Sequence, residues 1–106
     1  MVTLRYAKAA DQDLSTIYLT SDELFGPAQA DAYVARLKEA VDLLAEYPLA
    51  ARLRTETRPP VRVRRCGAHM IVYVVDEVGV LILRFRHGHE DWRADPLGDE
   101  AAGDPS

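Results

Sequence analysis

The sequence predicts an α+β fold in which a helical hairpin lies across one curled sheet. Apolar residues first recur with a helical period in two segments separated by Gly26-Pro27, and later form short β-branched runs bounded by turn residues. A chain of 106 residues also has room for one hydrophobic core, but not for a separate catalytic or cofactor domain. We therefore expect the helices and the sheet to share a single core.

The chain is expected to begin with a strand and a helix. Residues 2–6 alternate apolar and polar side chains, which is typical of a short strand with one buried face. Leu14, Ile17 and Tyr18 then lie on one stripe of a helix that runs roughly over residues 8–21, and Leu24 or Phe25 has the spacing to continue this stripe.

A second helix should follow directly. Gly26-Pro27 ends the first helix and starts the second, because proline is tolerated at the first helical position. The second helix has a sustained apolar stripe that comprises Ala30, Tyr33, Val34, Leu37, Val41 and Leu44. Tyr47-Pro48 ends it, since a proline disfavours helical geometry in the residue before it.

The remaining elements are three strands of a predicted antiparallel meander. Residues 61–65 alternate valine and arginine, so one face is apolar and the other is charged. Cys66-Gly67 turns the chain. Residues 70–75 and 80–83 are almost wholly apolar and rich in β-branched side chains, with turn residues 76–79 between them, and should be interior strands of an antiparallel sheet.

Charge divides the chain into a neutral domain, residues 1–93, and an acidic tail, residues 94–106. All 13 Lys and Arg residues and 13 of the 17 acidic residues belong to the domain, so the net charge of −4 comes from the tail. The acids of the tail are Asp95, Asp99, Glu100 and Asp104. Because the tail lacks apolar periodicity, we expect it to be disordered, or ordered only by a partner.

One stretch of the domain is strongly basic. Between residues 52 and 65, a single acid, Glu56, stands among six arginines, which are Arg52, Arg54, Arg58, Arg62, Arg64 and Arg65. Such a stretch can meet an acidic partner or a phosphate backbone, and a solvated arginine-rich strand and loop explains it equally well. Because the protein is acidic overall, direct sequence-specific nucleic-acid binding is not expected.

Little in the sequence indicates catalysis or a bound cofactor. Cys66 is the only cysteine, which excludes an internal disulfide and a cysteine-built zinc site and suits a reducing cytosol. No apolar stretch has the length of a signal peptide or a membrane span. Motifs for covalent catalysis and glycine-rich phosphate loops are missing, so we predict no catalytic residue, metal or cofactor, and a cytoplasmic location.

Histidines provide the main alternative to this view. Residues 87–91 read His-Gly-His-Glu-Asp just past the last predicted strand, and two imidazoles and two carboxylates can hold a metal on one face. A polar strand end explains the run as well. His69, at the start of an apolar strand, is more typical of a hydrogen-bonded structural residue than of a catalytic base.

Five motifs along the chain resemble, in order, those of ParE toxins in the RelE/ParE superfamily of type II toxin–antitoxin systems. Residues 10–18 (ADQDLSTIY) resemble the first helix of the family, and residues 25–33 (FGPAQADAY) resemble its aromatic-Gly-x-x-Gln-Ala-x-x-Tyr motif. Residues 44–52 (LAEYPLAAR) are similar to Leu-Ala-x-x-Pro-x-x-Gly-Arg, and residues 66–73 (CGAHMIVY) to Gly-x-His-x-Ile-x-Tyr. Residues 83–92 (LRFRHGHEDW) look like the Arg-Ile-Leu-His-x-x-x-Asp end of the family.

This resemblance covers residues 2–92 in unbroken order and departs from the family at a few positions. Ala51 and Pro60 stand where glycines are usual, and Arg86 replaces a common leucine. The resemblance implies a RelE/ParE-like fold, inhibition of DNA gyrase by binding rather than by catalysis, and neutralisation by a ParD-like antitoxin. The six arginines of residues 52–65 are then expected to contact an acidic antitoxin segment.

A ribosome-dependent mRNA endonuclease of the RelE branch is the alternative function. RNA cleavage needs a base near the 2′-hydroxyl and cations near the phosphate. Met70 stands where the nuclease branch tends to have an arginine, and Gly88 and Ala94 stand where that branch would supply an arginine and a tyrosine. Gyrase inhibition is therefore the expected activity, and an inactive relative that only binds its antitoxin is a further alternative.

The last strand and the residues after it form the predicted target-binding surface, which comprises Arg84, Arg86, His87, Asp91 and Trp92. Strand alternation puts Arg84 and Arg86 on one face. Leu83, Phe85 and His87 then share the other face. Two cations on an otherwise apolar strand need water, an acidic neighbour such as Asp91, or a partner. For Arg84, an internal salt bridge that closes the sheet is an equally good interpretation.

Overall fold

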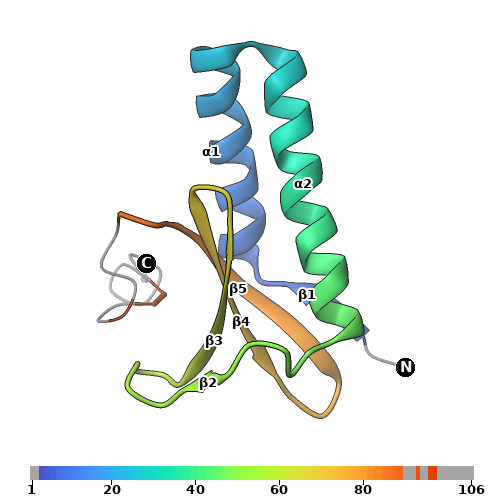
Figure 1. Cartoon of the computed structure of the whole chain (residues 1–106), viewed down its shortest axis with the longest axis vertical. Helices are drawn as coiled ribbons and strands as arrows, with labels where there is room; N and C mark the ends of the chain where they lie inside the picture. The colour runs from blue at the N-terminus through green and yellow to red at the C-terminus, as the bar shows by residue number, and fades with distance from the viewer. Residues whose placement is uncertain (1–2, 90–92, 94–95, 98–106) are drawn as a thin grey trace.

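The computed structural model describes residues 3–89, 93, 96 and 97, and it shows a helical hairpin packed against one open sheet (Figure 1). The described elements are, in chain order, β1 (Thr3–Tyr6), α1 (Lys8–Phe25), α2 (Pro27–Glu46), β2 (Leu53–Arg54), β3 (Val61–Cys66), β4 (His69–Val75) and β5 (Gly79–His87). The α+β class and the helical hairpin predicted from periodicity are confirmed.

The sheet has the strand order β1-β5-β4-β3-β2 and is mixed. Its β2–β3, β3–β4 and β4–β5 pairs are antiparallel, whereas β1 lies parallel to β5, with Thr3 opposite Gly79 and Tyr6 opposite Ile82. The prediction of a single N-terminal strand beside a three-stranded meander therefore needs correction to five strands. A two-residue strand such as β2 has no period to detect, and alternation within a segment does not report the direction of its neighbour.

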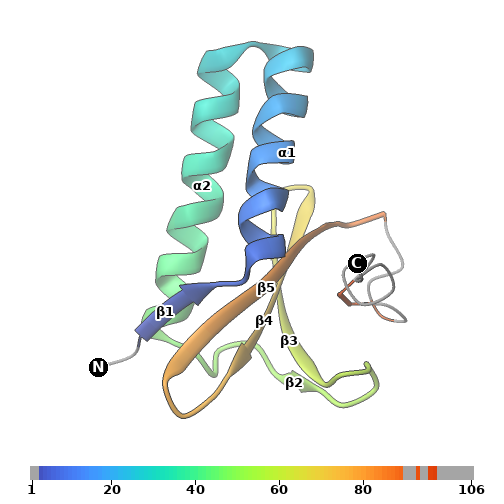
Figure 2. The ribbon, with the colours of Figure 1, turned by 180° about the vertical axis from the view of Figure 1, so that it is seen from behind.

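Gly26 both ends α1 and starts α2. Its N–H donates to the Asp22 carbonyl at 2.9 Å, its carbonyl accepts the N–H of Ala30 at 3.1 Å, and its φ of 92° favours glycine. Pro27 is the first residue of α2, as predicted. Since α1 continues past its predicted end, the exposed side chains of Leu24 and Phe25 stand at the hairpin loop, at the far end of the helices from β1 (Figure 2).

The core lies between the two helices and one face of the sheet. Its buried residues are Ala10, Leu14, Ile17, Leu37, Val41, Leu44, Ile71, Tyr73, Val80, Ile82 and Phe85. The apolar stripes read from the sequence thus face the sheet. In the part of the chain that the structure describes, neither helix combines the length and the apolar character that a membrane span requires.

The opposite face of the sheet carries a second apolar cluster made of Val61, Val63, Met70 and Val72. Neither helix contributes a buried residue to this cluster. Val61 and Val72 are nevertheless 0% exposed. Val74 and Leu83, from β4 and β5, pack against this cluster.

A bulge in β5 changes the side-chain alternation predicted for that strand. Tyr73 is opposite Ile82 and Val72 is opposite Arg84, so Leu83 has no partner of its own in the ladder. Leu83 packs on the second cluster, whereas Phe85 belongs to the main core. The prediction that Leu83 and Phe85 share a face is wrong, because one inserted residue reverses the alternation beyond it.

Two residues of the predicted tail, Pro96 and Leu97, pack against the domain. Pro96 is among the fully buried side chains, and the carbonyl of Leu97 accepts a hydrogen bond from Nη1 of Arg84. The expectation of a disordered tail over residues 94–106 stays a prediction. The rest of residues 94–106 lie outside the described part of the chain.

Candidate functional site

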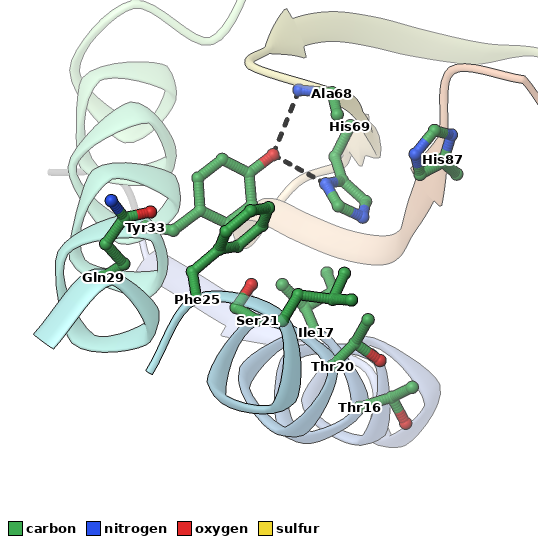
Figure 3. A pocket seen from close by; sticks show the side chains of 11 residues that line it. Thr16, Ile17, Thr20, Ser21, Phe25, Gln29, Tyr33, Ala68, His69 and His87 are labelled. Carbon is green, nitrogen blue, oxygen red and sulfur yellow. Dashed lines mark hydrogen bonds between the residues drawn. The ribbon is translucent and has the colours of Figure 1, made fainter. Parts of the chain in front are cut away.

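A pocket of about 410 Å³ lies between the hairpin and the end of the sheet (Figure 3). One side is lined by Gln29 and Tyr33 of α2 and by six residues of α1, which are Thr16, Ile17, Thr20, Ser21, Leu24 and Phe25. The other side is lined by Ala68, His69 and His87. At this end Tyr33 links the hairpin to the sheet, because its side chain reaches from α2 to the turn between β3 and β4. The pocket therefore combines an apolar helix face with two imidazoles.

Tyr33 is the central polar group of the pocket. Its hydroxyl lies 2.7 Å from Nδ1 of His69 and accepts the N–H of Ala68 at 3.1 Å. Burial raises the pKa of Tyr33, so the hydroxyl keeps its proton at neutral pH and can donate it to Nδ1. The ring also requires glycine at position 67, where φ is +60° and a Cβ would lie 2.8 Å from ring atoms of Tyr33.

The three histidines form a row beside Tyr33. His69 and His87 are cross-strand partners with ring centroids 5.2 Å apart, and the rings of His87 and His89 are 4.4 Å apart. Nδ1 of His87 also accepts the N–H of His89 at 3.2 Å. Among the described residues, no group of three or more His, Cys, Asp or Glu side chains is placed to hold a metal. The two carboxylates of the metal site that residues 87–91 offered as an alternative, Glu90 and Asp91, lie outside the described residues.

The described members of the predicted target-binding set, Arg84, Arg86 and His87, lie in different surroundings. Arg84 makes the internal ion pair that was one of its two interpretations: Nε lies 2.7 Å from Oδ2 of Asp13, and Nη2 lies 2.9 Å from Oδ1. Arg86 is buried, with 9% of its surface exposed. His87 lines the pocket. Asp91 and Trp92 lie outside the described residues.

Asp13 explains why Arg84 is held internally. β1 ends at Tyr6, opposite Ile82, so the edge of β5 beyond that point needs another hydrogen-bond acceptor. Oδ2 of Asp13 accepts the backbone N–H of Phe85 at 3.0 Å, and the same carboxylate binds the guanidinium of Arg84. One side chain of α1 thus continues the edge pairing that β1 begins.

The arginines of residues 52–65 are divided between different surroundings. Arg62 donates to the carbonyl of Ala51 at 2.6 Å, and Arg52 and Arg54 lie 3.5 and 3.7 Å from the Glu56 carboxylate. The other three members, Arg58, Arg64 and Arg65, are exposed, as is Arg52. The stretch is therefore not one basic patch, because alternation along β3 sends neighbouring side chains to opposite faces.

Tyr33, Phe25 and Asp13 are site residues that the sequence analysis did not select. Tyr33 was assigned only to the apolar stripe of its helix, although it also ends the second family-like motif. Phe25 begins that motif, and it is 65% exposed at the rim of the pocket beside Leu24, which is 67% exposed. Asp13 belongs to the first motif. Their common signal was therefore membership in a motif rather than periodicity.

Comparisons with known proteins agree with the motif order. The sequence model of the family described as the ParE toxin of type II toxin-antitoxin system, parDE, matches residues 4–92. Toxin ParE1 of Caulobacter vibrioides is 30% identical over 94 residues, which cover 89% of this chain and 97% of the relative. Toxin ParE1 of Mycobacterium tuberculosis is 31% identical over 84 residues, which cover 78% and 86%. A solved structure titled "Chromosomal ParDE TA system from P. aeruginosa" matches with a TM-score of 0.72 at 26% identity, over 82% of this chain and 96% of that one.

Proposed function

The chain belongs to the ParE toxin family of type II toxin–antitoxin systems, and on this premise we propose that it inhibits DNA gyrase in the cytoplasm by binding and that a ParD-like antitoxin neutralises it. The observation that carries the proposal is the continuous match of residues 4–92 to the toxin family, because this range includes both helices and all but the first residue of the sheet.

The pocket beside His87 is the surface that we assign to the target. Its lining is mainly apolar, its rim exposes Leu24 and Phe25, and its polar groups are hydroxyls, imidazoles and the amide of Gln29. Protein interfaces commonly combine an apolar centre with a few polar groups that fix orientation. His87 is the described member of the predicted target set that lines this pocket.

The exposed arginines are the surface that we assign to the antitoxin. Arg58, Arg64 and Arg65 have exposed side chains on or beside β3. An antitoxin segment that folds on binding can follow a strand of this kind and place carboxylates against the guanidinium groups. Complementary charge would chiefly raise the rate of association and the selectivity for this toxin.

Ribosome-dependent mRNA cleavage is the second candidate function, and one observation favours it. The hydroxyl of Tyr33 and the imidazoles of His69 and His87 face the same pocket, and such groups can transfer protons. Cleavage also needs a cation at the phosphate in the transition state. Among the described residues that line the pocket, none is arginine or lysine. Inhibition by binding is therefore the better supported proposal.

Purified protein distinguishes the two functions. Relaxed plasmid is incubated with DNA gyrase, ATP and the toxin, and we expect supercoiling to decrease with toxin concentration. Translating ribosomes treated with the same toxin should show no new mRNA ends by primer extension. The His87→Ala variant, with folding checked by circular dichroism, should lose inhibition. Unchanged gyrase activity together with new cuts in ribosome-bound mRNA would replace the proposal by the nuclease function.

A further inference from the structure

The side chain of Tyr33 joins α2 to the part of the sheet that carries the pocket histidines. Its hydroxyl accepts the N–H of Ala68 at 3.1 Å, and the carbonyl of Ala68 accepts the N–H of Gly88, just after β5, at 2.8 Å. The same hydroxyl lies 2.7 Å from Nδ1 of His69. Figure 3 shows the His69 ring between Tyr33 and His87, whose ring centroids lie 5.6 and 5.2 Å from its own. His69 is therefore the residue through which Tyr33 can act on His87.

The distances around Tyr33 indicate which group donates in its hydrogen bond with His69. The amide of Ala68 can only donate, so it uses one lone pair of the Tyr33 oxygen. The hydroxyl proton then has two acceptors to choose from, Nδ1 of His69 at 2.7 Å and the carbonyl of Cys66 at 3.5 Å. Only the shorter distance is an ordinary hydrogen-bond length. Because burial raises the pKa of Tyr33, the hydroxyl keeps its proton and donates it to Nδ1.

A donor at Nδ1 fixes the form of the His69 imidazole. In a neutral imidazole one nitrogen donates and the other accepts. Since Nδ1 of His69 accepts, the ring proton is on Nε2, and the ring cannot turn over without losing this bond. His87 is held in the same form, because its Nδ1 accepts the backbone N–H of His89 at 3.2 Å. The main chain thus fixes His87, whereas His69 depends on the side chain of Tyr33.

We propose that Tyr33 is a positioning residue for target binding, because its hydroxyl holds His69 as the neutral Nε2–H tautomer with its ring in T-shaped contact with His87. Tyr33 acts through His69 on His87, which is the imidazole that we assign to the target. The effect on gyrase rests on the proposed function, whereas the tautomer and the ring contact are properties of the toxin alone. In the opposite arrangement, Nδ1 of His69 would carry the proton and Tyr33 would donate to Cys66.

The expected effect is that of one hydrogen bond that orders a binding group. Tyr33→Phe removes the hydroxyl and keeps the ring, so the fold should be retained while His69 loses its donor. The net contribution of one such bond corresponds to a roughly two- to tenfold weaker inhibition of gyrase. Tyr47→Phe is the matched control, because it removes the hydroxyl of a tyrosine that is 62% exposed at the end of α2.

The first measurement uses the toxin alone. NMR spectra that correlate the imidazole nitrogens with the carbon-bound ring protons distinguish the two tautomers. At about pH 8, where imidazoles are ordinarily neutral, the unmodified chain and Tyr47→Phe should show the proton of His69 on Nε2. In Tyr33→Phe both tautomers should be populated, and the nuclear Overhauser effects between the rings of His69 and His87 should weaken. A proton on Nδ1 in the unmodified chain, or an unchanged His69 spectrum in Tyr33→Phe, would overturn the proposal.

The second measurement is the concentration of toxin that halves supercoiling by gyrase. It should be roughly two- to tenfold higher for Tyr33→Phe than for the unmodified chain, and unchanged for Tyr47→Phe. Equal values for Tyr33→Phe and the unmodified chain would overturn the role of Tyr33 in target binding.

Two further outcomes have a defined meaning. If circular dichroism shows that Tyr33→Phe is unfolded, His69→Asn replaces it, because its amide can accept the Tyr33 hydroxyl but provides no ring to contact His87. His69→Asn should inhibit at least twofold less well than the unmodified chain, and full inhibition would overturn the proposal. If the unmodified chain does not inhibit gyrase, the proposed function fails, and the NMR spectra still decide whether Tyr33 fixes His69 and its contact with His87.

Discussion

Asp13 shows how much of this fold depends on a single polar side chain. Its carboxylate accepts the Phe85 amide and pairs with Arg84, and both members of the ion pair are largely buried, with 16% and 14% of their side chains exposed. Loss of a buried acceptor destabilises a fold mainly because the donors that it paired are left without a hydrogen bond. The sheet edge beyond β1 therefore depends on a residue of α1.

We expect Asp13→Ala to lower the free energy of unfolding by roughly 2–3 kcal/mol, because a partly buried guanidinium and a backbone N–H both lose their acceptor. Urea unfolding followed by circular dichroism measures the change. Glu23→Ala, on an exposed position of the same helix, is the control and should stay within about 0.5 kcal/mol of the unmodified chain. Equal effects of the two substitutions would contradict the role given to Asp13.

Asp76 predicts a pH dependence of stability. Its carboxylate accepts hydrogen bonds from Arg5 at 2.8 Å and from the N–H groups of Val78 and Gly79. These interactions, with that of Arg5 the largest, hold the pKa of Asp76 below its ordinary value of 3.8. The ionised carboxylate therefore stabilises the fold above pH 3.8, and this contribution is lost as the pH falls below 3.8 towards the pKa of the folded state.

Asp76→Asn should therefore reduce the dependence of stability on pH. Between about pH 5 and about pH 3, the melting temperature of the variant should fall less than that of the unmodified chain. Glu77→Gln, at the exposed neighbouring position, should leave the slope unchanged. Differential scanning fluorimetry at several pH values gives both slopes, and identical slopes for Asp76→Asn and the unmodified chain would show that Asp76 makes no such contribution.

At the scale of elements, the pairing of β1 with β5 is the least local feature of the fold. The two strands lie at opposite ends of the chain and run parallel, so both helices must be in place between them. Gly79 permits the contact, because a Cβ there would lie 2.1 Å from the carbonyl oxygen of Thr3, and its φ of 152° also favours glycine.

Gly79→Ala is expected to detach β1 and to cost at least about 2 kcal/mol of stability. Hydrogen exchange of the amides of residues 4–6 should become faster, while exchange in β3 and β4 changes little. Gly26→Ala provides the comparison, because Gly26 also has a positive φ but a Cβ there would meet nothing within 4 Å. Unchanged exchange in β1 after Gly79→Ala would mean that the pairing tolerates a side chain.

At the scale of the whole molecule, two exposed apolar residues allow the proposed target surface to be tested without a change in stability. Phe25 is 65% exposed at the rim of the pocket, and Leu49 is 66% exposed in the loop after α2. An aspartate at either position should leave stability within about 0.5 kcal/mol, because neither side chain is part of the core. The two positions can therefore separate binding from folding.

We expect Phe25→Asp to weaken gyrase inhibition at least tenfold, because a charge at the pocket rim opposes burial against a partner. Leu49→Asp should inhibit as the unmodified chain does. The concentration of toxin that halves supercoiling is the measurement, and equal values for the two variants would remove the pocket from the target surface.

Local patterns in the sequence identified most of the secondary structure. The stripes of α1 and α2, the proline at the start of α2 and the apolar strands all follow from interactions between residues close in sequence. The motif order also identified the family, because five short matches in sequence are specific together. The prediction ended α1 near residue 21, whereas the helix continues to Leu24 and Phe25, whose side chains are exposed.

Only the tertiary structure decided which polar residues meet. Asp13 and Arg84, and likewise Tyr33 and His69, are brought together by helix packing and strand register. A bulge near Leu83 changed the face of the residues after it, which no period-two pattern can report. The amino-acid sequence by itself determined the elements, the family and the charge of the tail, because these depend on composition and short spacing. The positions of the arginines and of the pocket depend on contacts between distant segments, which exist only once the core has formed.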